Sequence, residues 1–152
     1  MPMEMPEVEN LVLANHVEAV NGLLYISGGG WTDHWRPQPP AGGPPIVSHL
    51  GVAVTVVVPP AAAPIPQQLS VAIEDEQERQ VAGVQTQINQ SRPAGLPAGQ
   101  PQRISLALTF NIVFPVAGEY RLVARLGISA PRELRFRVHD VAPPAAAAPP
   151  VN

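Results

Sequence analysis

LVLANHVEAVNGLLYISGGGW, residues 11–31, is the stretch that decides the fold. Two apolar runs flank Asn21 and Gly22, and both of these residues accept the positive φ that a type I′ turn requires. An Asn-Gly pair between β-type sequences is the strongest short-range signal of a hairpin. The stretch therefore predicts an N-terminal β-hairpin with strands over 10–16 and 23–28.

Three glycines and a tryptophan follow the second predicted strand. Gly28, Gly29 and Gly30 predict a bulge or a sharp bend, because glycine adopts backbone conformations that are closed to other residues. Trp31 would then fold back over the edge of the hairpin and close the end of the core.

Alternation of apolar and polar residues predicts further strands along the rest of the chain. These predicted strands cover residues 46–58, 69–73, 82–88, 103–112, 120–126 and 134–138. The segment 82–88 is polar enough to form a sheet edge. The run DHWRPQPPAGGPP, residues 33–45, predicts an irregular loop, and the acidic run 74–78 predicts an exposed turn. The 20 prolines cluster between these segments, as expected of residues that cannot donate to a sheet.

About eight short strands without a helical period predict an antiparallel β-sandwich, Ig-like or similar. A β-barrel is the alternative, which the proline-rich loops disfavour. We expect an extended lead-in over 1–9, a sandwich domain over 10–139 and a Pro/Ala-rich tail over 140–152 that is disordered or polyproline-like.

The composition excludes several classes of protein. No cysteine is present, which excludes a disulfide framework and a thiol nucleophile. The net charge is -3 and all nine basic residues are arginine, so a general nucleic-acid binder is not expected. No 18-residue apolar run is present, and the N-terminal segment carries acids where a signal peptide carries basic residues. We expect a cytoplasmic protein without membrane insertion.

The hairpin resembles the opening signature of a family of small bacterial proteins common in actinobacteria. The resemblance rests on Leu-Tyr-Ile at 24–26 and on the glycine triplet followed by Trp31. The Pro-x-Arg-Ile-x-Leu run at 101–106 and the Gly-Glu-Tyr run at 118–120 are also similar. Asn15 and Leu23 depart from the aspartate and lysine that are commoner there. The resemblance implies a small β domain and no catalytic residue, because the family has no established activity.

Residues that could support catalysis or metal binding do not form a recognisable motif. The glycine triplet is followed by prolines and no lysine, unlike a phosphate loop. His16, His34, His49 and His139 match no short ligand spacing, and Ser27 or Ser48 with His34 and Asp33 lacks a nucleophile elbow. The acidic turn lacks the pattern of a calcium loop. We therefore predict no catalytic residue, no metal and no cofactor.

The last predicted hairpin carries an arginine-rich face. With a turn centred on residue 129, Arg125 lies across from Glu133 and Arg121 lies across from Arg137, with Arg135 beside them. Directly opposed like charges are unfavourable, so Arg121, Arg135 and Arg137 predict contact with an acidic partner or an anionic ligand. A hydrated basic face is the alternative.

These features predict a structural or protein-interaction module that is not an enzyme. It would bind itself or another protein, as a homo-oligomer or as an accessory subunit of a larger assembly. The alternative is a sandwich that binds a small ligand or a carbohydrate through Trp31, Asp33, His34 and Trp35, since exposed aromatic residues stack on sugars. A hydrolase is the least favoured function.

Overall fold

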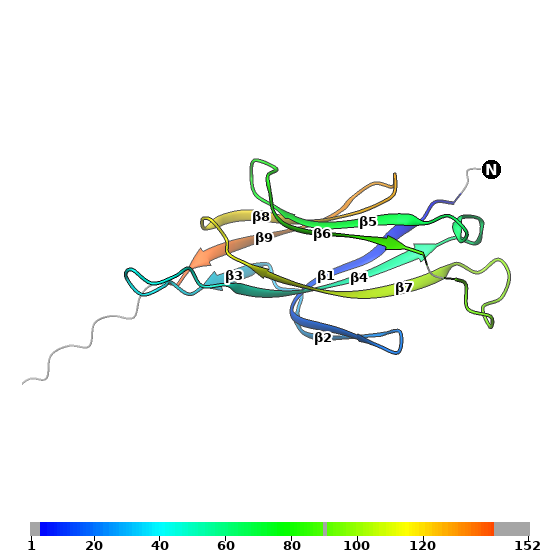
Figure 1. Ribbon diagram of the computed structural model, residues 1–152, viewed down its shortest axis with the longest axis horizontal. Helices are drawn as coiled ribbons and strands as arrows, with labels where there is room; N and C mark the ends of the chain where they lie inside the picture. Colours follow the sequence, from blue (N-terminus) through cyan, green and yellow to red (C-terminus); the bar gives the residue numbers. More distant parts are fainter. Residues whose placement is uncertain (1–3, 90, 142–152) are drawn as a thin grey trace, which may run out of the picture.

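The protein is an all-β sandwich, seen in a computed structural model that describes residues 4–89 and 91–141 (Figure 1). Among these described residues, nine strands form two packed sheets that do not close into a barrel, and one 3-10 turn, η1 (Pro60–Ala62), follows the fourth strand. The strands are β1 (Glu7–Val20), β2 (Leu23–Gly29), β3 (Asp33–Arg36), β4 (Ser48–Val58), β5 (Gln67–Glu74), β6 (Gln80–Ile88), β7 (Gln102–Ile112), β8 (Gly118–Leu126) and β9 (Arg132–Asp140). The sandwich fold predicted from the alternation is confirmed.

The first sheet has the strand order β2-β1-β4-β7, and all of its pairs are antiparallel. Its central strand β4 presents Leu50, Val52, Val54 and Val56 to the core, and all four are fully buried. β7 pairs with β4 along its whole length. β1 begins at Glu7, inside the segment predicted as a lead-in, because its first half pairs with β4 from residue 7 onward.

The second sheet has the order β3-β9-β8-β5-β6. β6 forms an edge, as its polar sequence predicted. The acidic run is only in part a turn, because Glu74 ends β5 and its side chain is buried. The prolines of the three inner clusters lie in the connections between strands, whereas the fourth cluster falls outside the described residues.

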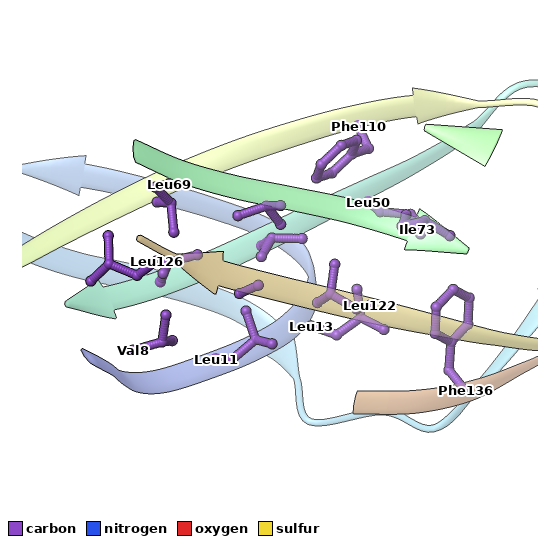
Figure 2. Packing of buried hydrophobic residues seen from close by; sticks show 14 of the residues in the cluster. Val8, Leu11, Leu13, Leu50, Leu69, Ile73, Phe110, Leu122, Leu126 and Phe136 are labelled. Atoms are coloured by element: carbon purple, nitrogen blue, oxygen red, sulfur yellow. The ribbon is translucent and has the colours of Figure 1, made fainter. Parts of the chain in front are cut away.

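One core lies between the two sheets, and alternate residues of both sheets fill it (Figure 2). Leu11 and Leu13 of β1 meet Leu122 of β8 and Phe136 of β9 there. Burying a side chain of this kind contributes about 1.5–3 kcal/mol. The alternation that predicted the strands therefore also supplies the main force that joins them.

The prediction of an irregular loop over 33–45 is wrong for its first four residues, because residues 33–36 form β3. This strand runs parallel to β9, with Asp33 opposite Arg137 and Arg36 opposite Asp140. The backbone N–H of Arg137 donates to the carbonyl of Thr32, and the Arg36 side chain donates to the Asp140 carboxylate. β9 would otherwise be an edge strand with free backbone groups, and β3 satisfies them until the prolines begin at residue 37.

Candidate functional site

The predicted N-terminal hairpin is present, and its second half forms a two-stranded arm. Asn21 and Gly22 have φ values of 51° and 77°, as a type I′ turn requires. β1 pairs with β4 only as far as Ala14, and from there on it pairs only with β2. Residues 15–28, called the hairpin arm below, therefore extend beyond the paired part of the sheet (Figure 1).

A bend at the base brings the hairpin arm onto the outer face of its own sheet. Val17 and Leu24 pack there against Ala53 of β4 and Ala107 of β7, in a small cluster separate from the main core. The backbone of His16 and Val17 crosses directly over Gly51, where a Cβ atom would lie within about 3.0 Å of it. Only glycine leaves room for this close approach.

Both sides of the hairpin arm carry large apolar side chains that are exposed, because Ile26 shares the side of Val17 and Leu24 whereas Leu23 and Tyr25 lie on the other side. Val20, Leu23, Tyr25 and Ile26 are 42–60% exposed. β2 contains no charged residue, and the nearest charges are Glu18 and His16 on β1, which contact each other at 3.1 Å. The hairpin arm thus presents an uncharged edge strand to solvent.

The four residues predicted to bind a ligand do not form one site. Trp31 and His34 point towards the core, whereas Asp33 and Trp35 point to the outer side. Trp31 packs against the main core, with its ring edge-on to Phe136 at 5.8 Å, and His34 stacks on Trp31 at 5.5 Å. Trp31 therefore closes the end of the core, as expected. The glycines before it supply the bend, with Gly28 at a φ of 62° and Gly30 at 83°.

His34 points inward, where its Nε2 atom hydrogen-bonds the buried Ser48 hydroxyl at 2.9 Å. Burial lowers the pKa of His34 below its ordinary value, because desolvation penalises the charged imidazolium. Asp33 lies on the other side of β3 and bonds a different histidine, so Ser48, His34 and Asp33 do not form a triad.

Asp33 and Trp35 face outward and meet a residue that the sequence analysis had not connected with them. His139 Nε2 donates to Asp33 Oδ1 at 2.7 Å, and its ring stacks on Trp35 at 4.7 Å. The hydrogen bond from His139 is the main reason why the pKa of Asp33 is lowered, and a hydrogen bond from Thr32 adds to it. Trp35 is 58% exposed, so one ring face is available to solvent.

The register of the last hairpin differs from the prediction by two residues. Arg121 pairs with Arg135, Glu119 pairs with Arg137, and Glu133 lies opposite Val123, so the predicted pairs Arg125–Glu133 and Arg121–Arg137 are wrong. The hairpin is centred on residue 128 instead of 129. All three predicted arginines still share the outer face, because a shift of two residues preserves the side to which a side chain points.

Carboxylates neutralise two of these three arginines. Arg137 bonds Glu119 at 2.9 Å. Arg121 lies 3.5–3.8 Å from the carboxylates of Glu74, Glu78 and Glu133. The Glu74 side chain is buried. Arg135 faces Arg121 and forms no ion pair with the residues that the structure describes. The face is therefore a mixed charge network in which, among the described residues, Arg135 has no carboxylate partner.

Within the described ranges, no group of three or more histidine, aspartate or glutamate side chains is arranged to hold a metal ion. The histidines lie in separate places. His16 and His49 stack on each other at 6.3 Å beside the base of the hairpin arm, whereas His34 bonds Ser48 and His139 bonds Asp33. No helix among the described residues has the length and hydropathy needed to cross a bilayer.

A family model described as a family of unknown function, DUF6941, matches residues 9–139, which is most of the chain. The chain belongs to the DUF6941 family. No curated protein matches it significantly. The DUF6941 match runs from β1 to β9 and so includes the hairpin arm, β3 and the arginines of β8 and β9. It is consistent with the resemblance to a family without an assigned activity.

Sequence reasoning had missed two features of this DUF6941 protein, the bend of the hairpin arm and the contact of His139 with Asp33. A glycine in a strand signals a close backbone approach, so Gly51 within the predicted strand 46–58 was the available signal for the bend. No signal indicated the parallel pairing of β3 and β9, because it joins residues about 100 positions apart.

Proposed function

We propose that this DUF6941 protein is a non-enzymatic protein-interaction module, which acts as a homo-oligomer or as an accessory subunit of a larger assembly in the cytoplasm. The main contact surface in this proposal is the hairpin arm. One observation carries the proposal. Among the described strand residues, five large apolar side chains are exposed, and four of them lie on the hairpin arm; these are Val20, Leu23, Tyr25 and Ile26, and the fifth is Trp35.

Two physical arguments support this assignment. A two-stranded ribbon is at best marginally stable in water by itself, and this one packs on the domain through little more than Val17 and Leu24. Apolar side chains that gather on one surface mark protein interaction sites more often than scattered ones do. A partner that covers the hairpin arm would both stabilise it and remove its apolar surface from water.

Photo-crosslinking in the native cell tests the proposal. A benzophenone amino acid replaces Leu23 on the hairpin arm, and in a matched control it replaces Ile128, which is 89% exposed in the turn between β8 and β9. We expect discrete covalent adducts from position 23 that position 128 does not give. Identical or absent adducts from the two positions would contradict the proposal.

A second candidate function is supported by the outward cluster on β3 and β9. Trp35 offers an exposed ring that His139 holds in place, and Asp33 offers an acceptor beside it. Aromatic rings of this kind stack on the apolar faces of sugars. A panel of oligosaccharides that shifts the tryptophan fluorescence of the wild type, but not that of Trp35→Phe, would support this function; no response from any member of the panel would exclude it for the compounds tested.

A further inference from the structure

We infer that the partner of the hairpin arm is a second copy of this chain, which pairs its own β2 antiparallel to β2 around a two-fold axis at Tyr25. The inference rests on the proposed function and names its partner. It follows from the edge that β2 exposes, from the register that this edge permits and from the charges beside it.

β2 has a free edge that carries no protection against pairing. Natural edge strands are blunted by charged residues, prolines, bulges or short length. β3 is four residues long and is followed by Pro37, and β6 carries polar glutamines. The large apolar side chains of β7 are buried or half-buried. β2 differs from these three edges, because it is seven residues long, contains neither charge nor proline and exposes Leu23, Tyr25 and Ile26.

The hydrogen-bonding pattern of the hairpin arm fixes which groups of β2 face outward. A two-residue turn places Val20 and Leu23 in a hydrogen-bonded pair, and such pairs alternate along an antiparallel ladder. The N–H and C=O groups of Leu24 and Ile26 therefore point away from β1. They are the groups that an added strand would bind, as in other complexes in which an extended segment joins a sheet.

A second β2 satisfies these groups symmetrically. With the two-fold axis at Tyr25, Leu24 of each copy pairs with Ile26 of the other, and both outward pairs of N–H and C=O groups are used. Tyr25 then faces its own counterpart, and Leu23 faces Ser27. Such an isologous contact closes at two copies, and the hairpin arms of the two copies become one four-stranded ribbon.

The charges near this edge permit self-association. A symmetric contact brings identical residues together, so a charge at the axis would oppose itself. β2 has none, and the adjacent Glu18 and His16 already contact each other within one copy. The arginine and glutamate network, by contrast, lies on the outer face of the other sheet. We expect a contact made by two hairpin arms to bury less than the roughly 1,200–2,000 Å² of a standard interface, and we therefore expect a reversible dimer.

Because the chain contains no cysteine, single-cysteine variants can test the register. In the proposed pair the two Tyr25 residues form a non-hydrogen-bonded pair with Cα atoms about 4.5 Å apart, within the range that a disulfide spans. Oxidised Tyr25→Cys should therefore give a covalent dimer. Leu23→Cys alone and Ser27→Cys alone should not, because in each case the two copies of the residue lie four positions apart along the ribbon. A mixture of these two variants should cross-link, because residue 23 of one copy faces residue 27 of the other. Tyr25 is unchanged in both variants.

Sedimentation velocity of the full chain gives the second measurement. The weight-average mass should rise from one chain towards two with concentration. Tyr25→Lys should weaken association at least about tenfold, as expected when a charge enters the centre of an interface, and circular dichroism checks that the variant is folded. Ile128→Lys is the matched control and should associate like the wild type.

The other outcomes are decisive. A wild type that stays monomeric at every concentration and a mixture that does not cross-link would overturn the second-copy inference. Open-ended oligomers, or equal cross-linking of every cysteine variant, would overturn it as well, because they indicate a contact without this two-fold axis. The proposed function fails only if photo-crosslinking from position 23 also yields no specific adduct with any protein.

Discussion

A Cβ atom on Gly51 would lie 2.8 Å from the backbone nitrogen of Val17, closer than real Cβ atoms approach backbone. The hairpin arm reaches its position only because β1 crosses β4 at this glycine. Gly51→Ala must therefore displace the backbone of His16 and Val17, and we expect it to lower the free energy of unfolding by about 1–3 kcal/mol, as overpacking does.

Urea denaturation measures this loss, and Gly95→Ala is its control, because a Cβ at Gly95 meets nothing within 4 Å. If Gly51→Ala were as stable as Gly95→Ala, the hairpin arm would not lie against β4 as described.

The register of β8 and β9 makes opposite predictions for two neighbouring arginines. Arg135 faces Arg121, so Arg135→Glu replaces a repulsive pair by an attractive one. Arg137 faces Glu119, so Arg137→Glu creates a repulsive pair and breaks an ion pair. Since such pairs contribute about 0.2–1 kcal/mol each, Arg135→Glu should be more stable than Arg137→Glu by about 0.5–2 kcal/mol. Thermal unfolding of the two variants checks this, and the reverse order would indicate the register centred on residue 129.

His34 should make stability depend on pH near neutrality. Its pKa in the folded protein lies below the ordinary 6.5 because burial disfavours the charged ring. The unfolded chain therefore binds the proton more readily, so the contribution of His34 is complete above about pH 6.5 and is lost as the pH falls below that value. We expect His34→Gln to reduce the decline in stability between pH 7 and pH 5, measured by urea denaturation at each pH.

Ser48→Ala is the matched variant for this experiment. It removes the hydrogen-bond partner of His34 but leaves the imidazole in place. It should keep the decline with falling pH, with its stability offset by the same amount at every pH. A decline that persists unchanged in His34→Gln would show that other groups cause it.

Glu78 holds a backbone conformation that glycine prefers, with a φ of 62° in the turn between β5 and β6. Glu78→Gly should raise the free energy of unfolding by about 0.5–1.5 kcal/mol, because the left-handed conformation costs a non-glycine residue about that much. Glu78→Ala removes the same contact with Arg121 without relieving the backbone. It should not be stabilising, and equal effects of the two variants would exclude backbone strain as the cause.

The sequence predicted those parts of the fold that depend on neighbouring residues. The turn at Asn21 and Gly22 and the strand around Val52 and Val54 follow from local backbone preference and from alternation, which act over a few positions. The position of Trp31 could also be predicted, because a large apolar side chain beside a bend is buried most readily at the end of the core.

The remaining features depend on contacts between distant residues. Alternation cannot distinguish a hairpin centred on residue 128 from one centred on 129, since a shift of two residues keeps every side chain on its face. The contact of Asp33 with His139 spans 106 positions. The predicted ligand site is divided because residues 33–36 form a strand and not the predicted loop. Neighbouring side chains of a strand, such as those of Asp33 and His34, point to opposite sides.

The parallel pair of β3 and β9 has a consequence for the order in which the chain assembles. The strands of the hairpin arm are adjacent in sequence, and a hairpin forms within about 1–10 μs. β3 must wait for a loop of about 100 residues to close and for β9 to be placed by β8, since contacts between distant residues form late. β3 should thus join the domain last and detach first, which would expose its amide hydrogens to exchange while β4 and β8 stay protected. Trp35 and the ring of His139 would separate in the same event, so the outward cluster exists only in the fully assembled domain.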